Sequence, residues 1–255
     1  MRDPSAERRS TRILVLSLDT AVDRQAAFAR AAPEGVDWSF FDAWRTLYPE
    51  LDYDEQRAQI NFGRVLTKGE IGCYSSHYAM WTALLEDEQA DRYIILEDDV
   101  IVDWEFIGRL SRTGDLGHDY IRLYYKRPVA SRKLVPEFIE RTKALVELHG
   151  YAFGTQGYVI SREGARRFRD ACRRVDRPID NAMDRSWVHG IPNLAIFPFP
   201  LIESFTESEI GGKRFERHPV PPALRGQWRR ARIAEKIRYQ LGRVRFFLRA
   251  LTGSA

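Results

Sequence analysis

The stretch YIILEDDVIV, residues 93–102, decides the expected fold. Four apolar or aromatic residues lead into three consecutive acids, Glu97, Asp98 and Asp99, and three β-branched residues follow them. A short apolar run of this kind is typical of a buried strand in a mostly parallel sheet, because helices cover both faces of such a strand. The three acids would then lie at the carboxyl end of the strand, where open α/β sheets bind their ligands.

Three adjacent carboxylates repel one another and lose solvation, so we expect a cation to compensate them. Oxygen ligands favour a divalent metal, Mn²⁺ or Mg²⁺. The alternative is a strand that simply runs into a solvated acidic turn. The apolar run in front of the acids favours the metal interpretation.

Size and composition suit one α/β domain with an appendage, since the chain has 255 residues and a hydrophobic fraction of 44%. It contains no run of 18 uncharged apolar residues, so we expect no membrane-spanning helix. The first twelve residues lack the apolar core of a secretion signal. Cys73 and Cys172 fit neither a disulfide framework nor a zinc site and are typical of a reducing compartment, which predicts a cytoplasmic protein.

Strands and helices alternate over about 190 residues, which predicts a mostly parallel sheet flanked by helices. The apolar runs place strands at 13–18, 36–41, 93–102, 119–125, 154–161 and 194–199. The helical segments are 23–32, 67–88, 103–110, 162–174 and 177–184, with a capping box at Thr67 and Glu70 and a cap at Ser161. Residues 44–64 are expected to be loop-like, 134–135 and 145–148 to form a β excursion, and Pro198 and Pro200 to mark an edge strand.

Three parts of the chain differ in composition. Residues 1–11 are predicted to be disordered, 12–210 to form the α/β domain and 211–255 to form a basic tail. The overall charge of +4 is asymmetric: from Lys213 onward twelve bases stand against two acids, a net of +10, so the preceding 212 residues carry a net of −6.

The tail is predicted to contain a basic amphipathic helix. Its apolar stripe consists of Ala234, Ile237, Leu241, Val244, Leu248 and Leu251, and its basic side of Arg232, Arg238, Arg243, Arg245 and Arg249. This pattern favours contact with an anionic membrane surface. The alternatives are docking on its own domain or on a second copy. A nucleic-acid partner is not expected, because the body shows no matching basic patch or aromatic platform.

Several polar residues are predicted to meet a ligand at the carboxyl edge of the sheet. Asp19 and Arg24 follow the first strand, and His77 falls off the apolar stripe of its helix. Taken singly, each of these residues is more often structural, as a helix-end charge, a surface ion pair or a buried histidine. Asp180 and Asp184 lie one turn apart on one face of a later helix.

Two motifs carry a resemblance to a known family. KGEIGCYSSH (68–77) ahead of LEDDV (96–100) resembles glycosyltransferase family 25, the lipopolysaccharide and lipooligosaccharide glycosyltransferases, whose relatives include collagen galactosyltransferases. The resemblance continues through Leu18-Asp19 with Asp23-Arg24, Gly154-Thr155 with GYVIS (157–161), and Pro178-Ile179-Asp180, and it covers about residues 13–205.

This resemblance implies a GT-A-like, Rossmann-type fold and transfer of a sugar, often galactose from UDP-galactose, with inversion. The residues that match the nucleotide-sugar site are Asp19, Arg24, His77, Glu97, Asp98, Gly154 and Thr155. Glu97 and Asp99 match the metal motif, and Asp180 matches the later acid. Gln156 and Glu203 depart from the family pattern, which leaves the donor and the acceptor open.

Glycosyl transfer suits these residue types. A metal held by Asp99 would stabilise the nucleoside diphosphate as it leaves, and a base would deprotonate the acceptor hydroxyl on the opposite face. Asp180 is the expected base, with Asp184 in reserve. We therefore expect a metal-dependent transferase acting on a glycan or glycolipid at the inner face of the cytoplasmic membrane.

Three other functions stay open. The same acids would serve another metal-dependent enzyme of nucleotide phosphates, although the chain has no G-x-x-x-x-G-K-[ST] loop. The chain could also be a decayed transferase that binds nucleotide sugars without turnover, or an adaptor built around its basic tail.

Overall fold

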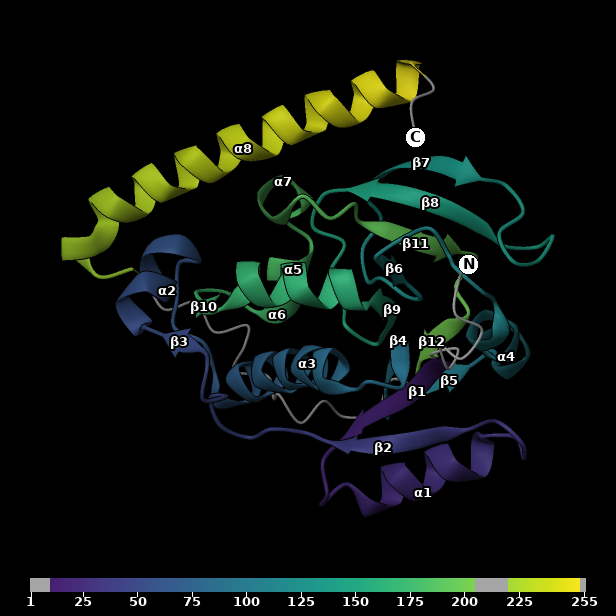
Figure 1. Ribbon diagram of the computed structural model, residues 1–255. Helices are drawn as coiled ribbons and strands as arrows, with labels where there is room; N and C mark the ends of the chain where they lie inside the picture. Colours follow the sequence, from purple (N-terminus) through teal and green to yellow (C-terminus); the bar gives the residue numbers. More distant parts are fainter. Residues whose placement is uncertain (1–9, 205–219, 253–255) are drawn as a thin grey trace, which may run out of the picture.

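The computed structural model describes residues 10–204 and 220–252 and centres on an eight-stranded sheet (Figure 1). The strand order is β2-β1-β4-β9-β6-β11-β8-β7. The bounds are β1 (Ser10–Ser17), β2 (Trp38–Asp42), β4 (Ala90–Glu97), β6 (Tyr120–Arg122), β7 (Ala130–Val135), β8 (Ala144–His149), β9 (Gly157–Ser161) and β11 (Leu194–Phe197). Two small sheets pair β3 (Asp52–Tyr53) with β10 (Arg174–Val175), and β5 (Val100–Val102) with β12 (Leu201–Glu203).

Most strands of the large sheet point in one direction. β2, β1 and β4 are parallel neighbours, and β6 and β11 are parallel to each other. β9 runs antiparallel between β4 and β6, and β8 runs antiparallel between β11 and β7. The reversal of β9 brings its first residue, Gly157, opposite Leu96 of β4. The residues that precede β9 therefore lie beside those that follow β4.

Helices cover both faces of the sheet, as Figure 1 shows. One core cluster joins α3 (Lys68–Glu86) and α5 (Arg162–Cys172) to the sheet, and the other joins α1 (Val22–Ala31) and α4 (Trp104–Arg112). Successive residues of β4 alternate between the clusters: Ile95 packs in the first, and Ile94 and Leu96 pack in the second. This alternation explains the continuous apolar run, because both sides of the strand are buried. The expected fold class, a mostly parallel α/β sheet flanked by helices with a further C-terminal helix, is confirmed.

The remaining helices are short, apart from the last. They are α2 (Glu55–Asn61), α6 (Ile179–Met183), α7 (Ser186–His189), the 3₁₀ helix η2 (Pro222–Leu224) and α8 (Arg225–Thr252). The capping box of α3 is formed as expected, with Glu70 N–H donating to Thr67 and Thr67 N–H donating to Glu70. Ser161 caps α5 by accepting from Gly164 N–H. Among the described helices, none has both the length and the apolarity needed to cross a membrane.

Several expected boundaries are wrong. The central strand ends at Glu97, and residues 100–102 form the separate strand β5 after a turn. The segment 44–64 contains α2, whose N-terminus is capped by Asp54. β11 lies between β6 and β8 rather than at an edge, because Pro198 and Pro200 come after its last paired residue. The predicted disorder of residues 1–11 falls almost wholly outside the described residues, since β1 begins at Ser10.

Candidate active site

A cleft of about 670 Å³ opens where β1 and β4 end and β9 begins. Four chain segments supply much of its lining: residues 16–18, 97–99, 153–156 and 178–181. The first two lie at the carboxyl ends of the parallel strands β1 and β4, and the third lies at the same edge because β9 is reversed. All three acids of the central motif line this cleft, so the sheet concentrates the polar residues at one site.

Asp98 is held by the end of β1 and by α1. Its Oδ2 accepts a hydrogen bond of 2.6 Å from Ser17 Oγ and one of 3.2 Å from Arg24 Nε. The carboxylate of Asp98 is 8% exposed, and Arg24 is its cationic partner. Asp98 therefore fixes the position of Arg24 at the cleft wall.

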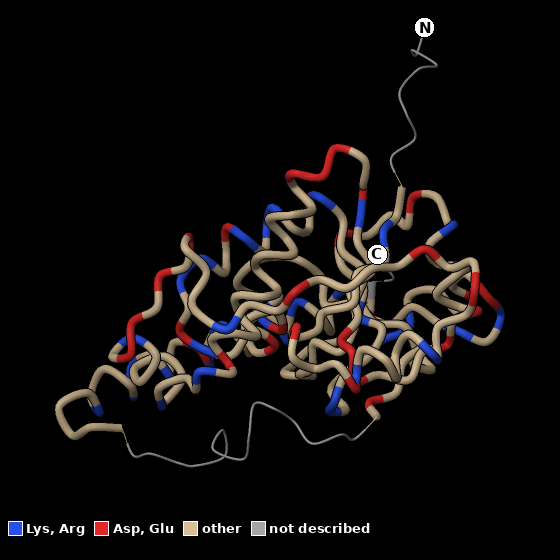
Figure 2. The backbone as a smooth tube through the Cα atoms, turned by 90° about the horizontal axis from the view of Figure 1, so that it is seen from below, with Lys and Arg blue, Asp and Glu red and all other residues tan. Residues whose placement is uncertain are grey.

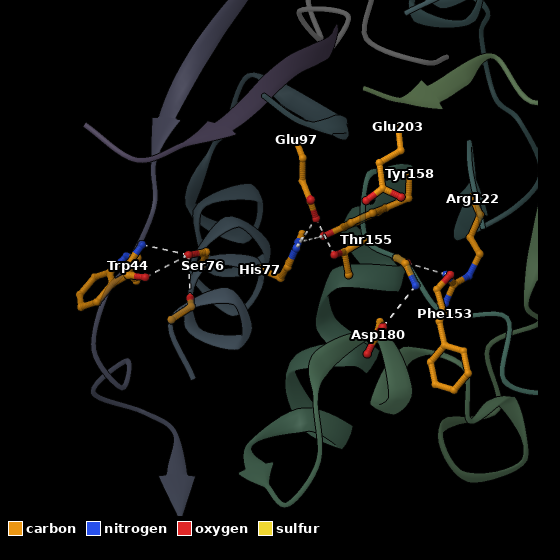
Figure 3. A network of polar contacts seen from close by, with 12 residues as sticks. Trp44, Ser76, His77, Glu97, Arg122, Phe153, Thr155, Tyr158, Asp180 and Glu203 are labelled. Carbon is orange, nitrogen blue, oxygen red and sulfur yellow. Dashed lines mark hydrogen bonds and ion pairs between the residues drawn. The ribbon is translucent and has the colours of Figure 1, made fainter. Parts of the chain in front are cut away.

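Glu97 continues into a buried polar chain (Figure 3). Its Oε1 accepts a 2.5 Å hydrogen bond from Thr155 Oγ1 and lies 3.8 Å from His77 Nε2. His77 Nδ1 is 2.9 Å from the hydroxyl of Tyr158, which in turn accepts from Trp81 Nε1 at 3.0 Å. Burial works to raise the pKa of Glu97, but His77 and Thr155 outweigh it and leave the pKa below its usual value.

The same chain places His77 behind the cleft rather than on its surface. His77 is 0% exposed and is absent from the cleft lining, so the expectation that it lines the site is wrong. Because the Tyr158 hydroxyl receives a hydrogen bond from Trp81, its own proton is available for His77 Nδ1. His77 would then carry its proton on Nε2, the nitrogen that faces Glu97.

Asp99 is the least compensated of the three acids. Its Oδ1 is buried and has no hydrogen-bond partner among the described residues. Burial raises the pKa of Asp99 to about 7, and the neighbouring carboxylates add to this effect. A buried carboxylate oxygen without a donor is costly, so Asp99 is suited to receive a cation or a donor from a ligand.

Asp180 lines the opposite part of the cleft, at the first turn of α6. Its Oδ1 accepts from the Asn181 N–H at 2.7 Å, and its Oδ2 accepts from the Gly154 N–H at 3.3 Å. Gly154 has a φ of +93°, and a Cβ there would lie 2.5 Å from Gln156 Oε1. Glycine is therefore required for the turn that presents its N–H to Asp180. Figure 3 shows Asp180 beside this turn, with Thr155 on the side towards Glu97.

Asp184, the expected reserve base, is instead a structural residue. Its side chain is 0% exposed and does not line the cleft. It receives Arg122 Nη2 at 2.8 Å, Asn193 Nδ2 at 3.0 Å and the Phe153 N–H at 2.8 Å. Burial raises the pKa of Asp184 to about 6. The structure therefore places Asp184 outside the cleft, with both of its oxygens already occupied, rather than at the position expected of a reserve base.

The two residues expected just after the first strand, Asp19 and Arg24, differ in whether they reach the cleft. Arg24 lines the cleft, as expected. Asp19 is 69% exposed, is bound by Arg45 and is not part of the lining, although its neighbour Leu18 is. Gly154 and Thr155 line the cleft, so the structure places every expected nucleotide-sugar residue there except Asp19 and His77.

A second charged pair in the cleft was not expected from the sequence. Lys126 Nζ lies 2.9 Å from Glu203 Oε1, and both residues line the cleft. Lys126 follows β6 and Glu203 closes β12, which pairs with β5 just beyond Asp99. The position of Lys126 after a strand was the signal available in the sequence. The pairing of β12 with β5 is long-range and carries no such signal.

The carboxylate oxygens at this site fit a divalent metal that takes most of its other ligands from a nucleotide. Among the described residues, no three His, Cys, Asp or Glu side chains converge as a preformed metal cage. Asp99 alone of the three motif acids has an orphaned buried oxygen, because Glu97 and Asp98 are engaged by Thr155 and Ser17. Mg²⁺ is commonly bound through one or two carboxylates and substrate phosphates, and this chain offers that arrangement.

Comparison with known proteins identifies the family. The sequence model of glycosyltransferase family 25, described as an LPS biosynthesis protein, matches residues 10–183. Human procollagen galactosyltransferase 2 is 34% identical over 108 residues, which cover 41% of this chain and 17% of that protein. The human inactive glycosyltransferase 25 family member 3 is 35% identical over 111 residues, which cover 41% of this chain and 18% of that protein.

A solved glycosyltransferase involved in the glycosylation of the major capsid of PBCV-1 shares 10% identity, covers 62% of each chain and superposes with a TM-score of 0.32. The chain thus spans less than a fifth of the length of these curated relatives. The family match, by contrast, extends from β1 through α6 and includes both the acidic motif and Asp180. The chain belongs to glycosyltransferase family 25.

Proposed function

We propose that the chain is an inverting, metal-dependent glycosyltransferase that moves a sugar from a nucleotide donor to a glycan hydroxyl. The observation that carries this proposal is the cleft itself. It combines the uncompensated carboxylate of Asp99 with a separate carboxylate, Asp180, supplied by another segment of the chain. A divalent metal bound by Asp99 would supply Lewis-acid stabilisation of the diphosphate leaving group.

The chain's own residues account for the rest of the reaction. Asp180 takes the proton of the acceptor hydroxyl, and the hydroxyl oxygen attacks C1 of the donor sugar. The bond from C1 to the diphosphate oxygen breaks, and its electron pair leaves with the nucleoside diphosphate. Attack from the face opposite the leaving group inverts the configuration at C1. Both oxygens of Asp180 accept backbone N–H bonds, which aim the carboxylate and hold it in place.

Basic side chains suit the donor's phosphates. Six bases line the cleft: Arg24, Arg45, Arg64, Lys68, Lys126 and Arg127. Arg24 is positioned by Asp98, and Lys126 by Glu203. Charge-assisted hydrogen bonds from such groups bind diphosphate strongly. The ion pairs at Asp98 and Glu203 hold the bases in place before the donor arrives.

The donor sugar and the acceptor are proposed from the names of the relatives and of the family. Galactose, carried as UDP-galactose, is the proposed donor because relatives are named procollagen galactosyltransferases. A lipopolysaccharide or lipooligosaccharide glycan is the proposed acceptor because the family is described as an LPS biosynthesis protein. The proposed place of action is the inner face of the cytoplasmic membrane, where such acceptors are anchored.

A donor-binding protein without turnover is the second candidate, favoured by the relatives that are named inactive. A panel of nucleotide sugars, each with and without Mn²⁺ or Mg²⁺, tests both functions. A donor at 100 times its Kd should stabilise the chain by about 2.7 kcal/mol, which raises the melting temperature by roughly 5–10 °C. The stabilisation should require the metal and disappear in Asp99→Asn.

Turnover then separates the two functions. Slow hydrolysis of the stabilising donor, measured as released nucleoside diphosphate, supports the enzyme. Stabilisation without any release or transfer supports the second candidate. If no nucleotide sugar stabilises the chain, the assignment of the cleft as a donor site is wrong.

A further inference from the structure

Helix α8 packs on the body through one row of side chains. Figure 1 shows α8 running past α2, α7 and the β7–β8 hairpin, and it contacts α2, α7 and β8. The inward row recurs every three or four residues and consists of Trp228, Ala231, Glu235, Tyr239, Gly242 and Phe246. Every member of this row is at least partly buried, and Phe246 is 2% exposed.

Specific contacts anchor the inward row. The carboxylate of Glu235 accepts from Arg185 at 2.6 and 2.8 Å and from the Tyr151 hydroxyl at 2.8 Å. His149 Nε2 lies 3.2 Å from the Tyr239 carbonyl, and its ring stacks on Phe246 with centroids 5.6 Å apart. The contacts fix the rotation of α8 about its own axis, so the same face is always turned outward.

That outward face is aliphatic. Its stripe consists of Ile233, Ile237, Leu241, Val244, Leu248 and Leu251, each between 54% and 84% exposed. At 100° per residue the stripe lies opposite the inward row, and it extends for roughly 27 Å along the helix. A continuous exposed stripe of this size marks an interaction surface, since scattered apolar residues would not align.

Basic residues flank the stripe on both sides. The helix carries nine bases and one acid, Glu235, which belongs to the inward row and is neutralised by Arg185. At 100° per residue, Lys236 and Arg243 fall on one shoulder of the stripe, and Arg238 and Arg245 fall on the other. In Figure 2 acidic and basic positions are interspersed over the body, whereas the sequence of α8 is almost purely basic.

We propose that α8 binds in the plane of an anionic lipid bilayer, with its aliphatic stripe among the lipid chains and its two basic shoulders at the headgroups. An apolar stripe between two rows of bases is complementary to a bilayer, which offers hydrocarbon below a negatively charged surface. A second copy of the chain would bring basic shoulders against basic shoulders. A nucleic acid would pair with the bases but leave the stripe in water. The proposal goes beyond the proposed transfer reaction and does not depend on it.

Vesicle binding by the full chain is the test. The chain should partition onto vesicles of phosphatidylcholine with about one third phosphatidylglycerol, and only weakly onto pure phosphatidylcholine. Salt should weaken binding as the screening length shrinks. The triple variant Ile237→Ser, Leu241→Ser, Val244→Ser should bind anionic vesicles on the order of a hundredfold less tightly.

A second triple variant tests the shoulders. Lys236→Gln, Arg238→Gln, Arg245→Gln should also lower binding to anionic vesicles by about a hundredfold, while leaving the weak binding to neutral vesicles unchanged. The matched control is Val22→Ser, Ile101→Ser, Ile202→Ser, which removes three exposed aliphatic side chains from α1, β5 and β12 rather than from α8 or from the elements packed against it, and it should bind as the parent does. All variants alter exposed residues, so their melting temperatures should stay close to that of the parent.

Three results would overturn the proposal. The first is equal vesicle binding by the stripe variant and the parent. The second is loss of binding in the shoulder variant alone, which would indicate a purely electrostatic surface. The third is a parent chain that light scattering shows to be a dimer and a stripe variant that is a monomer, because the stripe would then be an interface between copies.

Discussion

Asp184→Asn should destabilise the protein severely, although it changes only a few atoms. Asp184 and Arg122 are 0% and 1% exposed and lie 2.8 Å apart, beneath the turn that presents Gly154 to Asp180. Removing one partner of a buried ion pair typically costs about 3–5 kcal/mol, because the other charge stays buried without compensation. Arg122 would keep its bonds to the Gly154 carbonyl and to Asn193, and the variant would no longer bear the burial cost that raises the pKa of Asp184 to about 6. Both effects place the expected loss near the lower end of this range.

Equilibrium unfolding in urea measures this loss directly. A loss of about 3 kcal/mol corresponds to a fall in melting temperature of roughly 6–12 °C for a chain of this size. The matched control is Glu163→Gln, which breaks a 2.6 Å ion pair with Arg166 whose two side chains are 50% and 57% exposed. That control should change the free energy of unfolding by less than about 1 kcal/mol.

A double variant separates the loss of the pair from the burial of an unpaired charge. Arg122→Met with Asp184→Asn removes both charges but keeps an oxygen that can accept from the Phe153 N–H, and its free energy of unfolding should be closer to that of the parent than that of Asp184→Asn alone. If the free energy of unfolding of Asp184→Asn lies within about 1 kcal/mol of that of the parent, the ion pair does not support the turn, and the structural role assigned to Asp184 is wrong.

Three further perturbations have equally definite outcomes. Gly154→Ala should lower the free energy of unfolding by about 1–3 kcal/mol, because Gly154 has a φ of +93°. The control Gly226→Ala, whose added Cβ would meet nothing within 4 Å, should be neutral or stabilising. Similar values for the two variants would show that position 154 does not require glycine. Burial lowers the pKa of His189 to about 3, and its Nδ1 accepts the Ile191 N–H. Below about pH 6.5 the unfolded state therefore binds a proton at this histidine that the native state does not bind. The free energy of unfolding should fall as the pH is lowered from about 6.5 to 3, by at most about 1.4 kcal/mol per pH unit from this group. The fall should be shallower in His189→Asn. In the absence of donor and metal, Asp99→Asn should raise the free energy of unfolding at pH 8 by about 1 kcal/mol, because it removes an uncompensated buried carboxylate. A clear loss of stability would show instead that the carboxylate of Asp99 already has a partner.

Local patterns in the sequence were sufficient for much of the fold. The apolar run before Glu97 predicts a strand covered on both faces, and the alternation of Ile94 and Ile95 between two clusters confirms it. Thr67 and Glu70 predict the start of α3, because a capping box needs only residues three apart. Helix α2 was missed because its seven residues carry too little apolar periodicity to stand out among Tyr, Asp and Pro.

The part of the site that lies at the ends of neighbouring strands was predictable from the sequence. Asp98 and Arg24 follow neighbouring parallel strands, so their contact agrees with the expected sheet. The burial of His77 and Asp184 depends on partners 81 and 62 residues away, Tyr158 and Arg122. The local sequence does not indicate such distant partners. A histidine or an acid occupies the same position in the helical repeat whether its side chain faces a cleft or a buried arginine.

The role of Asp180 as general base is the central claim, and turnover of Asp180→Asn with the stabilising donor tests it most directly. In this variant kcat should fall by ~10²–10⁴ while the Kd of the donor changes by less than about twofold, because the base acts only on the acceptor proton in the transition state. Asp170→Asn, which alters an acid that is 72% exposed on α5, is the matched control and should turn over as the parent does. Turnover by Asp180→Asn at the parent rate, or a donor affinity that collapses together with turnover, would contradict the assignment.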